Sequence, residues 1–299
     1  MDEDAGMSRL FCFGLGYSAD TLATRLKRKE WSVAGTARDP ANVARLRAKG
    51  YAVCRYAGEP DNPEIPRLLA GTTHLLLSIP PGPDGDPVLR HYRDEIAALS
   101  TLDWIGYLST VGVYGNHSGA TVDETTTPLP NSERTKARVA AERDWLALGG
   151  EIRCPVQLFR LAGIYGPGRS ALDKIIAGTA RRVVKPGQVF NRIHVEDIAS
   201  VLEASIARPR AGGIYNVADD EPAPPEEVIA YAAELLGVEP PPAVPFEEAE
   251  LTPMARSFYG DSRRVSNALI KSELGVHLAF PTYWEGLQAL LSMHRPGAA

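Results

Sequence analysis

The residues best placed to do chemistry form a run of small side chains near the amino end, Gly14-Leu15-Gly16-Tyr17-Ser18-Ala19. They follow the apolar run Arg9-Leu10-Phe11-Cys12-Phe13 and precede a helical pattern. This G-x-G-x-x-A spacing between a strand and a helix is typical of a turn that binds a dinucleotide. Gly14 allows a sharp turn, Gly16 lets a diphosphate approach the backbone, and Ala19 lets the helix lie close to the strand. The positive end of the helix would then face the phosphates.

Alternating strand and helix patterns continue from this turn. Apolar runs predict strands at 9–14, 31–37, 52–56, 74–78, 104–109 and 155–161, and helical patterns span 18–29, 41–48, 87–99, 133–147 and 196–207. Continuous apolar strands are typical of a parallel sheet that is covered on both faces. With right-handed crossovers, the pattern predicts an α/β fold with a doubly wound, Rossmann-like parallel sheet. Glycine turns of this kind also occur without a ligand, and it is this alternation that favours a cofactor here.

The end of the second strand bears on which dinucleotide is expected. An NAD site usually has a carboxylate about twenty residues past the glycines, on the ribose 2′-hydroxyl. Thr36 stands near that position and Arg38 follows it. A guanidinium suits a 2′-phosphate through charge-assisted hydrogen bonds, although Arg38 could instead be a solvated surface charge. Asp39 is the competing acid, but Asp before Pro40 is also typical of a helix N-cap. We therefore expect NADP as the cofactor, with NAD as the alternative.

Residues beyond other strands complete the expected cofactor site. Ligands of open α/β sheets bind beyond the carboxyl ends of the strands. Ser78 and Ile79 follow the fourth strand, and we expect them near the adenosine or ribose. Ala162 and Ile164 follow the sixth strand, and we expect them to border the nicotinamide. Tyr17 and Ser18, at the start of the first helix, belong to the same set.

Composition excludes several function classes. The chain has 299 residues, a net charge of -5 and no basic run, which argues against nucleic acid or an anionic membrane as its main partner. Cys12, Cys54 and Cys154 lie far apart in apolar runs and predict reduced core residues rather than a metal site. No run is long enough for a membrane span, and the acidic start lacks a signal region. We expect a cytoplasmic protein with a small-molecule substrate, no metal, and a disordered extension over residues 1–6.

The regular alternation of strand and helix patterns ends after about residue 170. Residues 171–191 carry a helix and a basic stretch, 237–246 are proline-rich and irregular, and 265–292 look helical with interruptions. We predict an NADP-binding Rossmann-like domain over 1–218, with 171–191 contributing to a lid. Residues 219–299 would form a smaller substrate-binding or lid domain.

Three later segments carry a family resemblance. They are Tyr107-Leu108-Ser109-Thr110-Val111-Gly112-Val113-Tyr114-Gly115, then Phe159-Arg160-Leu161-Ala162-Gly163-Ile164-Tyr165-Gly166-Pro167-Gly168, and then Arg192-Ile193-His194-Val195-Glu196-Asp197-Ile198-Ala199 followed by Gly213-Ile214-Tyr215-Asn216-Val217. In this order they resemble the extended short-chain dehydrogenase/reductases, the NAD-dependent epimerase/dehydratase family. The resemblance covers roughly residues 9–220, and residues 283–287 show a weaker similarity to the family pattern. It implies a Rossmann-like sheet with a small C-terminal substrate domain, and it makes a homodimer plausible.

The resemblance also implies a catalytic set, which this sequence matches only in part. The family has a Ser or Thr at the end of the fifth strand, which Thr110 matches, although Thr110 could merely bond at a strand end. It also has a Tyr-x-x-x-Lys pair on the next helix. If Lys136 is that lysine, Ser132 holds the tyrosine position. If the glutamate four residues beyond the lysine is Glu142, the pair becomes Arg134 and Arg138, which we prefer.

Neither register supplies the tyrosine. Serine is a much poorer acid than a phenol, and arginine does not donate its proton. The arginines could bind an anionic substrate or the cofactor phosphates, or be solvated. We expect an atypical oxidoreductase or epimerase/dehydratase that acts on a small polar or sugar-like substrate. The alternatives are a non-catalytic NADP-binding sensor or regulatory protein, and an enzyme that binds another nucleotide.

Overall fold

The structure, a computed structural model, describes residues 8–60 and 62–294. The chain forms two compact units, and each unit is built from three separate segments of the sequence. The first comprises Met1–Val113, Pro130–Arg160 and Ala199–Tyr215, and the second comprises Tyr114–Leu129, Leu161–Ile198 and Asn216–Ala299. This division differs from the predicted one at residue 218, and the cofactor and substrate roles of the two predicted domains stay predictions. The expected extension over 1–6 lies outside the described residues.

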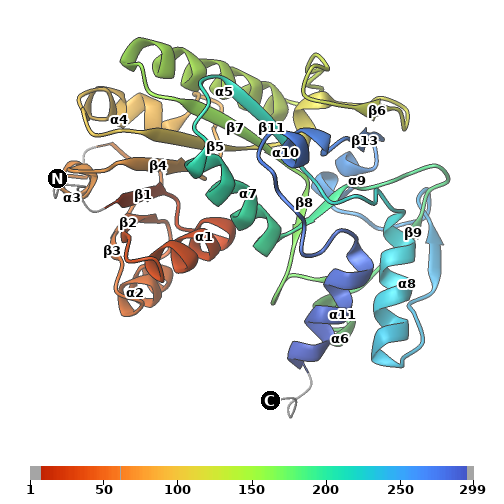
Figure 1. The fold of residues 1–299 in the computed structure, drawn as a ribbon. Helices are drawn as coiled ribbons and strands as arrows, with labels where there is room; N and C mark the ends of the chain where they lie inside the picture. Colours follow the sequence, from red (N-terminus) through yellow and green to blue (C-terminus); the bar gives the residue numbers. More distant parts are fainter. Residues whose placement is uncertain (1–7, 61, 295–299) are drawn as a thin grey trace. The chain divides into compact units, whose positions relative to one another are not determined.

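A seven-stranded parallel sheet organises the first unit, which confirms the predicted fold class. Its strands are β1 (Arg9–Phe13), β2 (Ser32–Ala37), β3 (Ala52–Arg55), β4 (His74–Leu77), β5 (Trp104–Thr110), β7 (Val156–Leu161) and β11 (Gly213–Val217). They follow the order β11-β7-β5-β4-β1-β2-β3 (Figure 1). The order reverses between β1 and β4, which pair in parallel. In such sheets the ligand crevice lies at the carboxyl ends of the strands where the order reverses.

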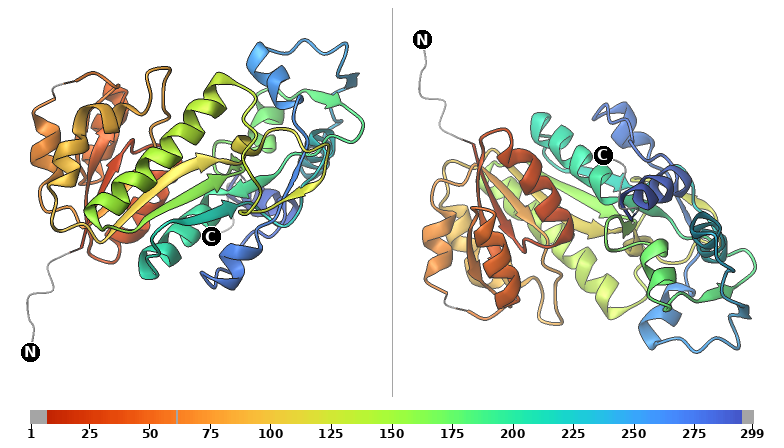
Figure 2. Two further views of the ribbon diagram at one scale, coloured as in Figure 1. Left: turned by 90° about the horizontal axis from the view of Figure 1, so that it is seen from above. Right: turned by 90° about the horizontal axis from the view of Figure 1, so that it is seen from below.

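Helices cover both faces of this sheet. They are α1 (Tyr17–Lys27), α2 (Pro40–Ala48), α3 (Glu64–Leu69), α4 (Pro87–Ala97), α5 (Glu133–Ile152) and α7 (Val195–Ala207). The two ribbon views of Figure 2 show α5 on one face of the sheet, with α1 and α7 on the other. Arg25 of α1 donates to the Ser200 hydroxyl of α7 at 2.9 Å, which fixes these two helices side by side. Five of these helices were predicted, and α3 was missed.

One core cluster joins the sheet to α3, α4 and α5. It contains Phe11 and Phe13 of β1, Ile65 of α3, Tyr92 of α4 and Trp145 of α5, each at most 3% exposed. Alternate strand residues point to opposite faces, so this cluster takes every second residue of β1. Because β1 is buried on both faces, it reads as a continuous apolar run in the sequence.

The second unit is built from short elements around its own cores. They are η1 (Val111–Tyr114), which begins in the first unit, β6 (Thr121–Val122), β8 (Gly163–Tyr165), α6 (Ala171–Ile176), β9 (Arg182–Val184), β10 (Arg192–His194), α8 (Pro225–Leu236), β12 (Ala243–Pro245), α9 (Pro253–Phe258), β13 (Arg264–Val265), α10 (Ala268–Ser272) and α11 (Tyr283–His294). Its larger core packs α6, α8 and α11 around Leu172, Tyr231 and Tyr283. The interrupted helices predicted for 265–292 are confirmed by α10 and α11. The stretch 237–246, predicted to be irregular, contains β12, which pairs with β9.

The three cysteines are buried and free, as expected. Across residues 8–60 and 62–294, no group of three acidic, histidine or cysteine side chains is arranged to hold a metal ion. Over the same described range, no helix has the length and apolar character that crossing a bilayer requires.

Candidate functional site

The glycine turn after β1 is held by hydrogen bonds from the end of β2. Gly14 has φ of 89°, in the left-handed region that favours glycine. Its N–H donates to the Thr36 hydroxyl oxygen at 3.0 Å, and the Leu15 N–H donates to the Thr36 carbonyl oxygen at 2.7 Å. A Cβ on Gly14 would also lie 3.0 Å from Cγ1 of Ile79. The backbone angle and a packed neighbour therefore both require glycine at position 14.

The second glycine of the motif has neither constraint. Gly16 has φ of -90° and is the N-cap of α1, where no side chain caps the helix. A Cβ on Gly16 would meet only the Gly14 carbonyl oxygen, 4.0 Å away. The first intrahelical bond runs from the Asp20 N–H to the Gly16 carbonyl at 2.8 Å. Because the N–H groups of a first turn have no intrahelical acceptor, an uncapped start with free space beside it fits a phosphate group.

The remaining motif residues lie at the start of α1. Ala19 is fully buried, Ser18 is buried and Tyr17 is half-buried. The small side chain of Ala19 therefore lies in the interface between α1 and the sheet, as the motif predicted.

The end of β2 presents a guanidinium rather than a free carboxylate. Thr36 is fully buried and its hydroxyl is used by the glycine turn. Asp39 caps α2 by accepting the Ala41 N–H at 3.1 Å, which confirms its N-cap interpretation. Arg38 is exposed, and among the described residues its side chain has no hydrogen-bond or ion-pair partner. The end of β2 therefore presents one exposed guanidinium, while its neighbouring carboxylate is engaged as the N-cap of α2.

The carboxyl end of β4 lies beside the same turn. The Ser78 N–H donates to the Phe13 carbonyl at 2.9 Å, which extends the β4–β1 pairing to the end of β1. Ile79 follows and faces Gly14, since its Cγ1 would lie 3.0 Å from a Cβ placed on that glycine. The structure thus brings Ser78 and Ile79 next to the glycine turn. Their contact with the adenosine or ribose stays a prediction.

Thr110 ends β5 and is half-buried. Its hydroxyl oxygen accepts the Gly112 N–H at 3.1 Å. A hydroxyl group has one hydrogen to donate and two lone pairs that accept. The bond from Gly112 therefore orients the Thr110 oxygen and leaves its O–H able to donate to another oxygen.

The helix that follows contains no tyrosine over Glu133–Ile152. The Lys136 ammonium is exposed and donates to Glu133 at 2.8 Å. Arg138 instead donates to the Tyr107 hydroxyl at 3.0 Å and to the Leu108 carbonyl at 2.9 Å. Burial raises the pKa of Tyr107, so its hydroxyl stays protonated. The contacts favour the register in which Arg138, rather than Lys136, faces β5; a catalytic role of Lys136 stays a prediction.

A buried ionic network behind Thr110 was not predicted. The Arg160 guanidinium donates to both Glu142 oxygens, at 3.2 and 2.8 Å, and the Ser109 hydroxyl donates to the same carboxylate. All three residues are at most 5% exposed. Strand alternation is the signal that could have found it, since Ser109 and Tyr107 share the β5 face that meets α5. The network fixes α5 against β5 and β7.

Two predicted cofactor residues belong to the second unit. Ala162 is buried and its N–H donates to the Val217 carbonyl at 3.0 Å. Ile164 lies in β8 and pairs with Ile193 of β10. Their contact with the nicotinamide stays a prediction.

Comparison with known proteins identifies the family. The model of the NAD dependent epimerase/dehydratase family matches residues 96–218. Protein YeeZ of Escherichia coli strain K12 is 30% identical over 249 residues, which cover 79% of this chain and 86% of that protein. A solved structure described as a functionally unknown conserved protein from Silicibacter pomeroyi is 51% identical, with a TM-score of 0.89 over 96% of this chain and 99% of that chain.

A more distant structure shares the fold. It is a dTDP-glucose 4,6-dehydratase from Bacillus anthracis in complex with NAD, 16% identical with a TM-score of 0.78 over 97% of this chain and 96% of that chain. Such low identity supports the architecture alone. Taken with the strand order, the glycine turn and the family match, these relatives show that the chain belongs to the NAD-dependent epimerase/dehydratase family.

Proposed function

We propose that this chain binds NADP in preference to NAD, and that it is an oxidoreductase or an epimerase/dehydratase acting on a small polar or sugar-like substrate. The observation that carries the proposal is the open space at Gly16 beside an uncapped helix start. The dehydratase that shares the fold is a complex with NAD, which supports a dinucleotide as the ligand class.

The first unit offers groups for the diphosphate, the 2′-phosphate and the adenosine ribose, whereas the residues proposed for the nicotinamide belong to the second unit. The glycine turn and the start of α1 would hold the diphosphate, and Arg38 would bind the 2′-phosphate. Ser78 and Ile79 would border the adenosine or its ribose, while Ala162 and Ile164 would border the nicotinamide. When bound, the nicotinamide would exchange a hydride with a substrate carbon.

Thr110 is the residue proposed to orient the substrate. The bond from Gly112 uses only a lone pair of the Thr110 oxygen. The O–H group can therefore still donate to a carbonyl or hydroxyl oxygen. Arg138 is bonded to the sheet, and arginine retains its proton at any ordinary pH. Proton transfer would therefore come from Thr110 with a water, from another side chain, or from the substrate itself.

Calorimetry with NADP and NAD tests the cofactor. We expect Arg38→Ala to weaken NADP binding by about 10–100-fold, which corresponds to one charge-assisted contact, and to change NAD binding much less. Arg28→Ala is the matched control, since Arg28 is also exposed but ends α1 at the far end from the glycines. Equal losses for both dinucleotides would remove the NADP assignment. Failure of either dinucleotide to bind the wild-type chain would remove the proposal as a whole.

A nicotinamide-absorbance screen over carbonyls, alcohols and nucleotide sugars tests the catalytic part. Oxidation or reduction of any of them is expected, and no turnover with a bound cofactor would sink the enzyme assignment.

The second candidate function is a non-catalytic NADP-binding sensor or regulatory protein. The absence of tyrosine from α5 favours it. It requires NADP binding without turnover, together with a change in oligomeric state or partner affinity that sedimentation would detect. We also propose a homodimer and a cytoplasmic location; the three buried, unpaired cysteines support the latter.

A further inference from the structure

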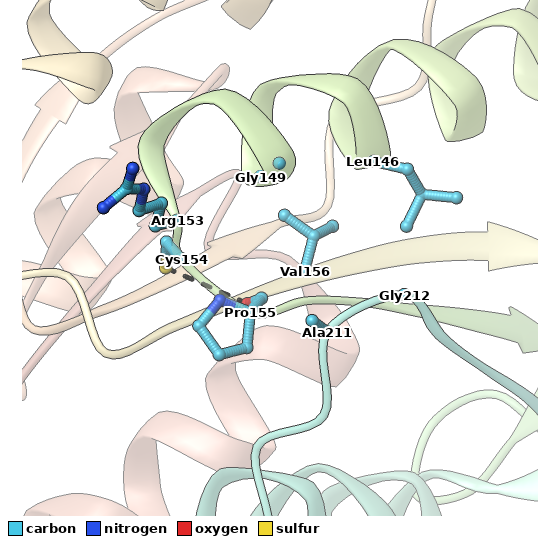
Figure 3. Close-up of a pocket in the computed structure, with 9 residues that line it drawn as sticks. Leu146, Gly149, Arg153, Cys154, Pro155, Val156, Ala211 and Gly212 are labelled. Atoms are coloured by element: carbon cyan, nitrogen blue, oxygen red, sulfur yellow. Dashed lines mark hydrogen bonds between the residues drawn. The ribbon is translucent and has the colours of Figure 1, made fainter.

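A surface pocket lies in the first unit between the end of α5 and the loop before β11. Its volume is about 390 Å³, within the range of small-molecule sites. Figure 3 shows Leu146, Val156 and Ala211 around the hollow, with Arg153 at its edge.

This pocket is separate from the cofactor edge of the sheet. Val156 is the first residue of β7, and Gly212 directly precedes β11, so the pocket lies at the amino ends of these strands. The glycine turn follows the carboxyl end of β1, and Thr110 is the last residue of β5. A strand of this length spans about 20 Å, so a ligand here would not touch the cofactor.

The lining is apolar apart from one cation. Leu146, Pro155, Val156 and Ala211 supply hydrocarbon surface. Cys154 adds a neutral thiol, because burial raises its pKa to about 12. The thiol is therefore part of the apolar wall and not a nucleophile.

Two residues at this pocket go against local structural preference. Gly150 lies inside α5, where glycine costs stability relative to alanine, yet a Cβ there would meet no atom within 4 Å. By contrast, a Cβ on its neighbour Gly149 would lie 2.4 Å from Val156, so packing requires that glycine. Arg153 ends the helix with φ of 56°, a conformation in which glycine is favoured. Departures from local rules without a packing reason concentrate at functional sites.

The charge at the mouth is positive. Arg153 is exposed, and within the part of the chain that the structure describes its guanidinium contacts no carboxylate. The carbonyl end of α5 contributes roughly half a negative charge, which the full charge of Arg153 exceeds. Asp103 lies near enough to Cys154 to raise the pKa of its thiol and is the opposing charge.

From these features we propose that the pocket binds an amphipathic carboxylate, with its hydrocarbon part in the hollow and its carboxylate on Arg153. Gly150 keeps the entrance open, and Arg153 provides a charge-assisted hydrogen bond to the anion. The site is independent of NADP and adds a second ligand class to the proposed function.

Calorimetry on the full chain with decanoate, decanol and decylamine tests the proposal, with and without NADP. Decanoate is expected to bind most tightly, and saturating NADP should leave its affinity unchanged. Gly150→Leu fills the space in which a Cβ meets nothing and should abolish binding. Arg153→Gly should weaken decanoate binding about tenfold and leave decanol unaffected. Arg28→Ala is the matched control and should bind decanoate as the wild type does.

The variants remain informative because both are expected to fold. Arg153→Gly relieves a left-handed arginine, and Gly150→Leu replaces a helical glycine, so each should raise or retain the melting temperature. The proposal is overturned if decanoate fails to bind, if decanol or decylamine binds as well, or if Gly150→Leu binds like the wild type. Concentration-dependent self-association that Gly150→Leu abolishes would assign the pocket to a second copy of the chain and would also overturn it.

Discussion

Gly16→Ala separates the folding role of the glycine turn from its binding role. Position 16 has φ of -90°, which alanine adopts, and the new methyl group would have nothing closer than the Gly14 carbonyl oxygen at 4.0 Å. The change replaces an N-cap glycine by alanine and should cost about 0.5–1 kcal/mol. For a chain of this size that lowers the melting temperature by about 2 °C. The free protein is thus expected to fold almost as stably as the wild type.

The effect on cofactor binding should be much larger. The methyl group would occupy the space beside the uncapped start of α1, so at least one amide bond to the diphosphate is lost. A hydrogen bond to a charged group is worth about 1.5–3 kcal/mol, which is a factor of about 10–150 in Kd. At NADP equal to 100 times the wild-type Kd, the cofactor stabilises the wild type by about 2.7 kcal/mol. With Kd raised about 100-fold, the variant gains only about 0.4 kcal/mol at the same NADP concentration.

Thermal unfolding with and without NADP, together with calorimetric Kd values, measures both effects. Gly150→Ala is the control, because a Cβ there also meets nothing within 4 Å and the residue lies on α5 at the opposite edge of the sheet. It should bind NADP normally and raise stability by about 1 kcal/mol. Wild-type affinity for NADP in folded Gly16→Ala would refute the assignment of the diphosphate to this turn.

Three further outcomes are expected. Burial raises the pKa of Asp219 to about 8, and the nearby Arg192 opposes this rise only in part. Folding therefore favours the protonated form, and stability should fall by at most about 1.4 kcal/mol per pH unit as the pH rises from about 4 to 8. Urea midpoints of Asp219→Asn should lack this decline. Glu142→Ala leaves the Arg160 charge buried without its partner and should lower the free energy of unfolding by about 3–5 kcal/mol in urea titrations; a loss below 1 kcal/mol would contradict the ionic role of this pair. Thr110→Val should reduce kcat about 100-fold without changing Kd for NADP, while Thr110→Ser retains most activity; equal rates for both variants would dismiss the hydroxyl.

The fold was largely predictable because its central strands are buried on both faces. The runs around Phe11 and Leu76 are apolar at nearly every position, so strand periodicity was not needed to find them. The short strands β8, β9, β10 and β12 have three residues each and no pattern of their own. Their conformation comes from pairing with distant segments, as β12 does with β9. The sequence predicted none of these short strands.

The sequence by itself determined the glycine turn, the N-cap at Asp39 and the absence of a tyrosine from α5, because each is a local property of a few consecutive residues. Tertiary structure decided which groups are engaged. The Thr36 hydroxyl is bound by a residue 22 positions away, and Arg138 by one 31 positions away. Lys136 and Arg138 are two residues apart on a helix, so their side chains are rotated by about 200° about the helix axis and lie on nearly opposite faces. Only the packing of α5 on β5 determined that Arg138 faces the sheet.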